Sequence, residues 1–292
     1  MSIFSHLFMQ YALAGALVTG LAAPALGTYL VQRRMALIGD GIGHVALTGV
    51  AVGLLTSSEP VVTAMLVAAV GAVGIELVRA HGRTPGDVAL AVLFYGGIAG
   101  GVFLVNLSAS HTNANLLAYL FGSPLTISPA DLWVMVGLAG GVLAVSLGLR
   151  PWLFAACHDE EYARVSGLPV RTLNLVLAVT TAVTVTVAMR AVGLLLVSAL
   201  MVVPVATAQL LASGFRATQY LAMGIGLVVA GAGVAAAGVF DTAPGATIVL
   251  LAIAAFLLAT VAAGAWRRLR RSFAPGAADV VEPEPPEVVL TR

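Results

Sequence analysis

The run GATIVLLAIAAFLLATVAAGA, residues Gly245 to Ala265, contains no charged side chain. A helix needs about 20 apolar residues to cross a hydrocarbon core about 30 Å thick, so this run is long enough to span a bilayer. A membrane β-barrel would instead alternate apolar and polar residues, and this run does not alternate. Similar runs fill most of the sequence, near residues 8–32, 38–56, 60–80, 86–107, 130–149, 172–191, 193–212 and 218–239.

These runs predict an all-α fold, a polytopic transmembrane helical bundle with about eight or nine membrane helices. Two of the expected spans are less regular than the others. The run 38–56 begins with glycines and a charged residue, and Pro204 interrupts the run 193–212. For the second run, a full crossing and a broken or re-entrant helix are both open alternatives, because proline removes a helical hydrogen bond.

The composition excludes several classes of protein. Of the 292 residues, 60% are hydrophobic and 9% are charged, whereas soluble domains have about 25% charged residues. The net charge of +1 provides no basic field for nucleic acid, and one cysteine, Cys157, excludes a disulfide framework. All basic residues are arginine, so the chain has no P-loop lysine, and any ATP hydrolysis must occur on another polypeptide. We therefore expect neither an enzyme nor a bound cofactor.

Arginine placement predicts the orientation, because short arginine-rich loops stay on the cytoplasmic side. With nine crossings, one face carries Arg33, Arg34, Arg79, Arg83, Arg150, Arg164, Arg171, Arg216, Arg267, Arg268, Arg270 and Arg271. Arg190 is the exception, since it falls near the opposite face. The prediction for domains is a transmembrane domain over residues 1–272, followed by a disordered cytoplasmic tail over 273–292 that is rich in proline and glutamate.

An aspartate and a histidine lie inside the apolar sequence, where charges are costly and ask for a partner or a function. Asp40 and His44 are four residues apart in the segment Gly39-Asp40-Gly41-Ile42-Gly43-His44, so a helix would place both on one face. An oxygen and an imidazole nitrogen together suit zinc, manganese or iron. The alternative is an Asp–His pair that satisfies itself and caps the helix.

Glu76 is the second acidic residue within an apolar run. It precedes Arg79 by three residues, and an ion pair near the membrane surface is the simpler explanation. A role as a third metal ligand or as a gate in the pathway is the alternative.

The largest polar loop is built like a short helix with defined ends. Acids begin it, an arginine follows one turn later, and glycine and proline end it, a pattern that predicts one capped helix between two spans. Such a helix can dock on a soluble subunit. The residues of this segment are Asp159, Glu160, Glu161, Arg164, Gly167, Leu168 and Pro169.

With these residues in view, the chain resembles the permease subunits of the bacterial zinc/manganese ABC importer family, the ZnuB/MntB-like membrane proteins. Four blocks carry the resemblance: Arg33–Leu47, Gly86–Leu93, Glu161–Pro169 and Val192–Ala208. The resemblance implies a type II ABC importer-like permease in the bacterial cell membrane. The acidic and histidine positions of the family fall on Asp40 and His44, and the ATPase-coupling helix falls on 159–169.

The family resemblance also implies partners. Two permease copies would form a homodimer in membrane lipid around a central pathway, with an ABC ATPase below and an extracytoplasmic metal-binding protein above. The transported ion would be Zn²⁺ or Mn²⁺, with zinc slightly favoured. The alternatives are an ABC permease for a metal chelate or corrinoid, and a secondary transporter that works without an ATPase.

Overall fold

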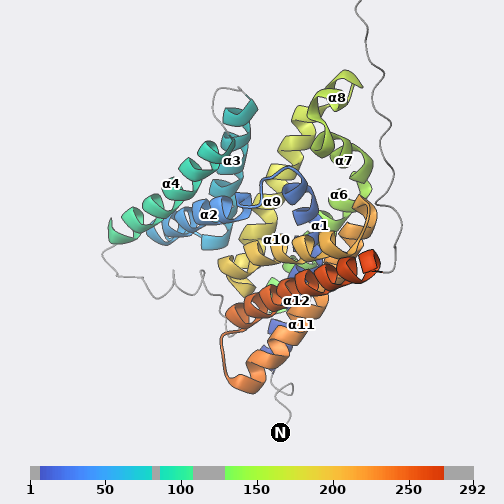
Figure 1. Ribbon diagram of the computed structural model, residues 1–292. Coiled ribbons are helices and arrows are strands. Elements are labelled where there is room, and N and C mark those ends of the chain that lie inside the picture. Colours follow the sequence, from blue (N-terminus) through green and yellow to red (C-terminus); the bar gives the residue numbers. More distant parts are fainter. Residues whose placement is uncertain (1–6, 81–85, 108–128, 273–292) are drawn as a thin grey trace, which may run out of the picture.

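The computed structural model describes residues 7–80, 86–107 and 129–272. Within these ranges every regular element is a helix (Figure 1). The helices are α1 (Leu7–Gln32), α2 (Ile38–Leu55), α3 (Pro60–Ala80), α4 (Gly86–Leu107), α6 (Pro129–Gly148), α7 (Arg150–His158), α8 (Glu160–Val165), α9 (Val170–Val192), α10 (Leu194–Leu211), α11 (Phe215–Phe240) and α12 (Pro244–Ser272). The segment 273–292, with its predicted tail, lies outside the described residues.

Nine helices in the described part of the chain are long and apolar enough to cross a membrane. They are α1, α2, α3, α4, α6, α9, α10, α11 and α12, and each corresponds to one predicted span. The prediction of an all-α membrane bundle is confirmed.

The helix α10 decides between the two alternatives that Pro204 left open. It continues through Pro204 without a break, because neighbouring helices in a membrane bundle can accommodate the hydrogen bond that proline removes. The chain is interrupted instead at Gly193, which ends α9 and precedes α10 with a backbone φ of 85°. Glycine adopts this left-handed conformation without steric cost, so the break between the two spans lies there.

Helix α1 lies at the centre of the bundle, where it contacts α6, α9, α10 and α11. Small residues allow these close approaches. A Cβ atom added to Gly20 would lie 2.7 Å from the carbonyl oxygen of Gly226 on α11, and one added to Gly27 would overlap the backbone of Met201 on α10. Packing of this kind holds membrane helices together where hydrophobicity cannot.

Buried polar groups join α1 to its neighbours. The hydroxyl of Tyr29, which is fully buried, donates a hydrogen bond to the carbonyl oxygen of Ser146 on α6. Gln219 on α11 donates from Nε2 to the carbonyl oxygen of Ala25 at 3.0 Å and to the Tyr29 hydroxyl at 3.3 Å. These bonds connect three helices in the centre of the bundle.

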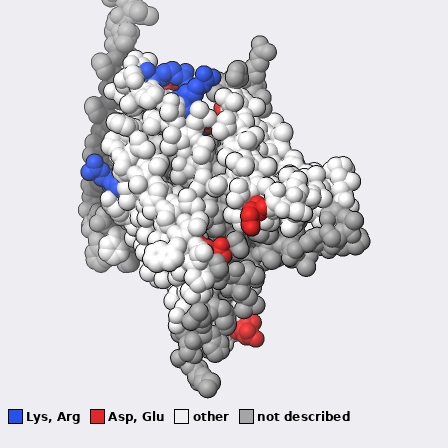
Figure 2. Space-filling view, turned by 180° about the vertical axis from the view of Figure 1, so that it is seen from behind, with Lys and Arg blue, Asp and Glu red and all other residues white. Residues whose placement is uncertain are grey.

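Figure 2 shows basic side chains gathered at the end of the molecule where Figure 1 places α8, and a smaller group on one side. Arg33, Arg79 and Arg164 meet there around one carboxylate. These three arginines therefore lie on one face, as predicted, and the assignment of that face to the cytoplasm stays a prediction. The side chain of Arg190, the exception to that pattern, is not among those that the structure describes.

Candidate functional site

Asp40 and His44 lie one turn apart on α2, and both are half-buried. The glycines between and beside them are buried against neighbouring helices. A Cβ atom on Gly41 would lie 3.3 Å from Leu93 of α4, and one on Gly43 would overlap the side chain of Leu194 on α10. The glycines of this segment therefore let α2 lie close to two helices while it carries a carboxylate and an imidazole.

Helix α4 holds the imidazole of His44 in place. The ring packs edge-on against Phe94, with ring centroids 4.7 Å apart. A Cβ atom on Gly97 would lie 2.7 Å from the backbone of His44, so only glycine permits this approach. One turn further along α2, Thr48 donates a hydrogen bond to the carbonyl oxygen of Gly97 at 2.7 Å.

Glu76 is not brought together with this pair into a three-ligand site. Among the described residues, no group of three or more His, Cys, Asp or Glu side chains could hold a metal ion. The Glu76 carboxylate is buried and lies 3.5 Å from the guanidinium of Arg79. The geometry supports the simpler explanation, an ion pair three residues apart, and one copy of the chain offers Asp40 and His44 as its paired ligand candidates.

The predicted helix in the large loop is present as α8. The Asp159 carboxylate accepts a hydrogen bond from the backbone N–H of Tyr162 at 2.9 Å and so caps the helix. At the other end, Gly167 adopts a φ of 82°, and Leu168 donates its N–H to the carbonyl oxygen of Ala163 at 3.1 Å. Pro169 then precedes α9. The structure adds α7 before it, which the sequence interpretation did not separate from the loop.

Glu160 has a different position from the one expected of a partner-facing residue. Its carboxylate lies 3.3 Å from Arg33, 3.6 Å from Arg79 and 3.1 Å from Arg164. The side chain of Arg33 is only 6% exposed, whereas that of Glu160 is 38% exposed. Arg33 also donates to Asn174 Oδ1 on α9 at 2.9 Å. Glu160 therefore joins α8 to α3 and to the turn that follows α1, and Arg33 joins that turn to α9.

The sequence interpretation missed Arg33 and Arg79 as partners of Glu160. Arg33 lies 127 positions from Glu160 along the chain, so no local spacing could reveal the contact. The opposite face of α8 is exposed: Glu161 and Tyr162 lie there, together with Val165, which is 88% exposed. Gly167 and Pro169 are exposed as well, and Leu168 is half-buried. This outer face is free for a partner.

Cys157 lies at the end of α7, just before this segment. Burial raises the pKa of its thiol to about 11, and the nearby Arg33 and Arg79 only partly oppose that effect. Since the thiolate is the reactive form, we expect little reactivity at neutral pH. The chain contains no other cysteine, which makes Cys157 a specific reporter for this region.

Comparisons with known proteins agree with this architecture. The sequence matches the family described as the ABC 3 transport family over residues 5–263. The chain belongs to the ABC 3 transport family. The manganese transport system membrane protein MntC of Halalkalibacterium halodurans is 31% identical over 257 residues, which cover 88% of each chain. The chelated iron transport system membrane protein YfeD of Yersinia pestis is 31% identical, covering 88% of this chain and 86% of that protein.

A solved structure supports membership of the ABC 3 transport family in three dimensions. PsaBC from Streptococcus pneumoniae in complex with Fab matches with a TM-score of 0.77 at 28% identity, covering 88% of this chain and 92% of the matched chain. The family resemblance predicted from the four sequence blocks is confirmed. So is the prediction of a multi-pass membrane subunit of an ABC transport system that is not itself an enzyme.

Proposed function

We propose that this chain is the permease subunit of an ATP-driven importer of a divalent transition metal ion. The observation that carries the proposal is the Asp40–His44 pair, a carboxylate and an imidazole one turn apart and half-buried in a membrane helix. Ionisable residues inside membrane spans are costly and mark transport pathways. A site with few ligands holds an ion briefly and releases it, as transport requires.

Manganese is the ion that the relatives favour. One relative of this chain is named a manganese transport protein and another a chelated iron transport protein. An Asp–His pair accepts manganese, iron or zinc, so the ligand types alone do not select among them. We propose manganese as the principal cargo, and zinc stays a prediction from the sequence resemblance.

A second copy of the chain would complete the ion site. One copy supplies two ligands from α2, whereas transition metals in proteins take four or more. A twofold axis beside α2 would bring two Asp40–His44 pairs together and provide four protein ligands. We propose such a homodimer, in which the ion passes between the two copies of α2.

The segment 159–169 would couple this site to a separate ABC ATPase. The exposed face of α8, with Glu161, Tyr162 and Val165, is the surface that would contact it. Glu160 would transmit the movement inward, because it binds Arg33 in the turn that leads directly into α2. Arg33 precedes Asp40 by seven positions in the sequence. Movement of α8 would therefore reach the ion site through one ion pair and one turn.

Uptake of radioactive manganese tests the ion site. In cells that express the whole importer, Asp40→Asn and His44→Gln should each lower uptake at least about tenfold, the effect of losing roughly 1.4 kcal/mol of binding. Asp241→Asn is the matched control, since Asp241 lies exposed at the end of α11. Normal uptake by both pair variants, at equal protein levels in the membrane, would remove the metal assignment.

An importer of a metal chelate is the second candidate, and the relative named for chelated iron favours it. A chelated ion already has its ligands, so the Asp40 and His44 variants would transport it normally. Uptake of free manganese compared with a chelated iron separates the two candidates. Loss of free-ion uptake alone supports the first, and uptake of the chelate alone supports the second.

A further inference from the structure

A cavity of about 660 Å³ lies between the start of α7 and the turn that joins α10 to α11. Its charged lining residues are Arg150 and Arg216, and no acidic residue lines it. The rings of Phe154 and Phe215, with centroids 4.7 Å apart, form part of the apolar wall. Its volume is in the range of small-molecule sites. The cavity is separate from the Asp40–His44 pair and from the outer face of α8.

The positive charge in this cavity is uncompensated within the described part of the chain. Arg33, Arg79 and Arg164 each form an ion pair with Glu160. Arg150, in contrast, donates to the hydroxyl of Tyr220 at 2.8 Å and lies 4.7 Å from the centre of that ring. Its Nε atom is buried and has no hydrogen-bond partner among the described groups. Its guanidinium therefore has a neutral hydroxyl but no carboxylate as a partner among the described residues, so its positive charge is suited to an added anionic acceptor.

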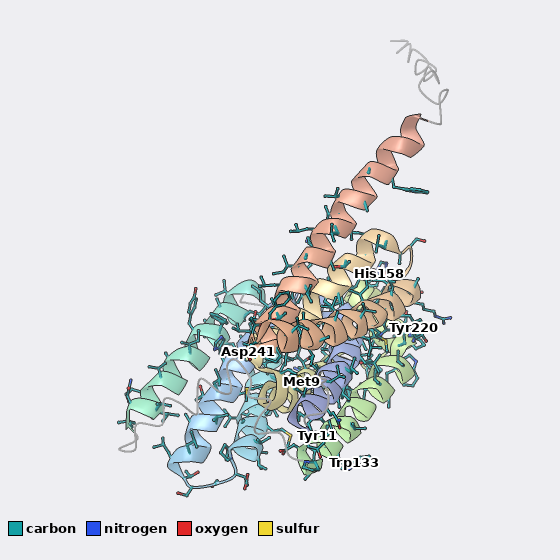
Figure 3. All side chains as sticks on the ribbon, turned by 90° about the horizontal axis from the view of Figure 1, so that it is seen from below. Met9, Tyr11, Trp133, His158, Tyr220 and Asp241 are labelled. Atoms are coloured by element: carbon teal, nitrogen blue, oxygen red, sulfur yellow. The ribbon has the colours of Figure 1, made fainter. Side chains whose placement is uncertain are left out.

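The location of the cavity indicates the source of that acceptor. It lies where α6 and α7 meet and where α11 begins, at the level where spans end and arginines are frequent. Trp152 and Tyr220 beside it are each 55% exposed, and Figure 3 shows Tyr220 at the edge of the bundle. Tryptophan and tyrosine at such positions mark the headgroup level of a bilayer. Anionic lipids in the cytoplasmic leaflet attract arginines there.

We propose that this cavity binds the phosphate group of an anionic phospholipid from the leaflet at the arginine-rich end of the bundle. Arg150 and Arg216 supply donors to the phosphate oxygens, as guanidinium groups do in bidentate contacts. Phe154 and Phe215 contact the apolar part of the lipid next to the headgroup. The lipid joins the start of α7 to the start of α11 and so stabilises α7, which leads into the segment 159–169. Its binding does not depend on which ion the importer carries.

Lipid retention by the purified full-length chain tests this proposal. The chain is placed in nanodiscs of phosphatidylcholine with one quarter phosphatidylglycerol and is then extracted with mild detergent. Native mass spectrometry measures how much of each lipid stays bound to the chain. Wild type should retain phosphatidylglycerol, whereas Arg150→Gln/Arg216→Gln should retain about tenfold less. Arg216→Gln alone, a change at an exposed position, should lose part of the retention and guards against misfolding of the double variant. Arg171→Gln, at an exposed arginine outside the cavity, should behave as wild type.

The remaining outcomes overturn either the site itself or the assignment of its phosphate group to a lipid. The site would be overturned if wild type retained the two lipids in the proportion in which the discs contain them. It would also be overturned if Arg171→Gln and Arg216→Gln lost equal amounts of bound phosphatidylglycerol. Inorganic phosphate is added to phosphatidylcholine discs as a second arm. If phosphate raises the melting temperature through these arginines while no phosphatidylglycerol is retained, the site takes a free anion and the lipid source is wrong. In a third arm the double variant is expressed with the rest of the importer; if it retains phosphatidylglycerol as wild type does but loses the co-purifying ATPase, the cavity is a subunit contact and the proposal is overturned.

Discussion

Replacing Glu160 by glutamine should loosen the contact between the segment 159–169, which we propose couples to the ATPase, and the turn that leads into α2. The surface of that segment that contacts a partner is kept. Glutamine keeps the shape of the side chain but loses the charge that binds Arg33 and Arg79. The guanidinium of Arg33, 3.3 Å from the carboxylate, would then lose its counter-ion, whereas Arg79, 3.6 Å from the carboxylate, would keep Glu76 at 3.5 Å. We expect α8 to separate more often from the turn that leads into α2.

The cost follows from the burial of the partners. Removing one partner of a fully buried ion pair costs about 3–5 kcal/mol, and removing one from an exposed pair costs roughly 0–1 kcal/mol. Arg33 is 6% exposed and Glu160 is 38% exposed, so this cluster lies between the two limits. A local destabilisation of about 2 kcal/mol is therefore expected, which raises the population of the open state about 30-fold.

The single cysteine of the chain provides the assay. Cys157 lies on α7, which packs against α8, and burial raises the pKa of its thiol to about 11. Labelling with a maleimide at neutral pH therefore measures transient opening, and its rate should rise about 30-fold in Glu160→Gln. Because Glu160 also helps to raise the thiol pKa, the rate is measured across pH. A larger open population multiplies the labelling rate at every pH, whereas an electrostatic effect alone shifts the midpoint of the pH dependence of that rate.

Glu161→Gln is the matched control, since Glu161 is the exposed neighbour on the same helix. It should label at nearly the wild-type rate but weaken co-purification of the ATPase. The reasoning would be refuted if Glu160→Gln labelled as slowly as Glu161→Gln. It would also be refuted if Glu160→Gln transported metal normally while its labelling rate rose as expected.

Two substitutions and one pH titration test the packing and the thiol. Gly27→Ala would overlap backbone on α10 and should destabilise the chain by about 1–3 kcal/mol, while Gly74→Ala, where nothing lies within 4 Å, should leave the thermal melting in detergent unchanged. Tyr29→Phe should lower stability by about 1–2 kcal/mol in the same assay, because it removes the donor to Ser146 and the acceptor for Gln219. The labelling rate of Cys157 should keep rising to about pH 11 and not level off near 9.0. The folded chain binds the proton of the Cys157 thiol more tightly than the unfolded chain does. The contribution of this proton to the free energy of unfolding is therefore complete below pH 9.0 and is lost as the pH rises towards 11.

The local properties of the sequence predicted most of the fold. Each membrane span depends on the apolar length of one segment, which is why all nine could be read from the sequence. The short helix α8 could also be predicted, because its cap at Asp159 and its end at Gly167 depend on nearby residues. At Pro204 the sequence left two alternatives open, since the effect of the proline depends on the helices around it.

The sequence by itself determined that this is a membrane bundle with few internal charges, that Asp40 and His44 share a helix face, and that a short capped helix lies between two spans. Only the tertiary structure decided which charges meet. It paired Glu160 with Arg33 across more than a hundred positions and placed Arg150 and Arg216 together in a cavity. The physical reason is that helix formation and membrane insertion depend on contiguous residues, whereas ion pairs and cavities depend on the distances between helices that packing alone sets.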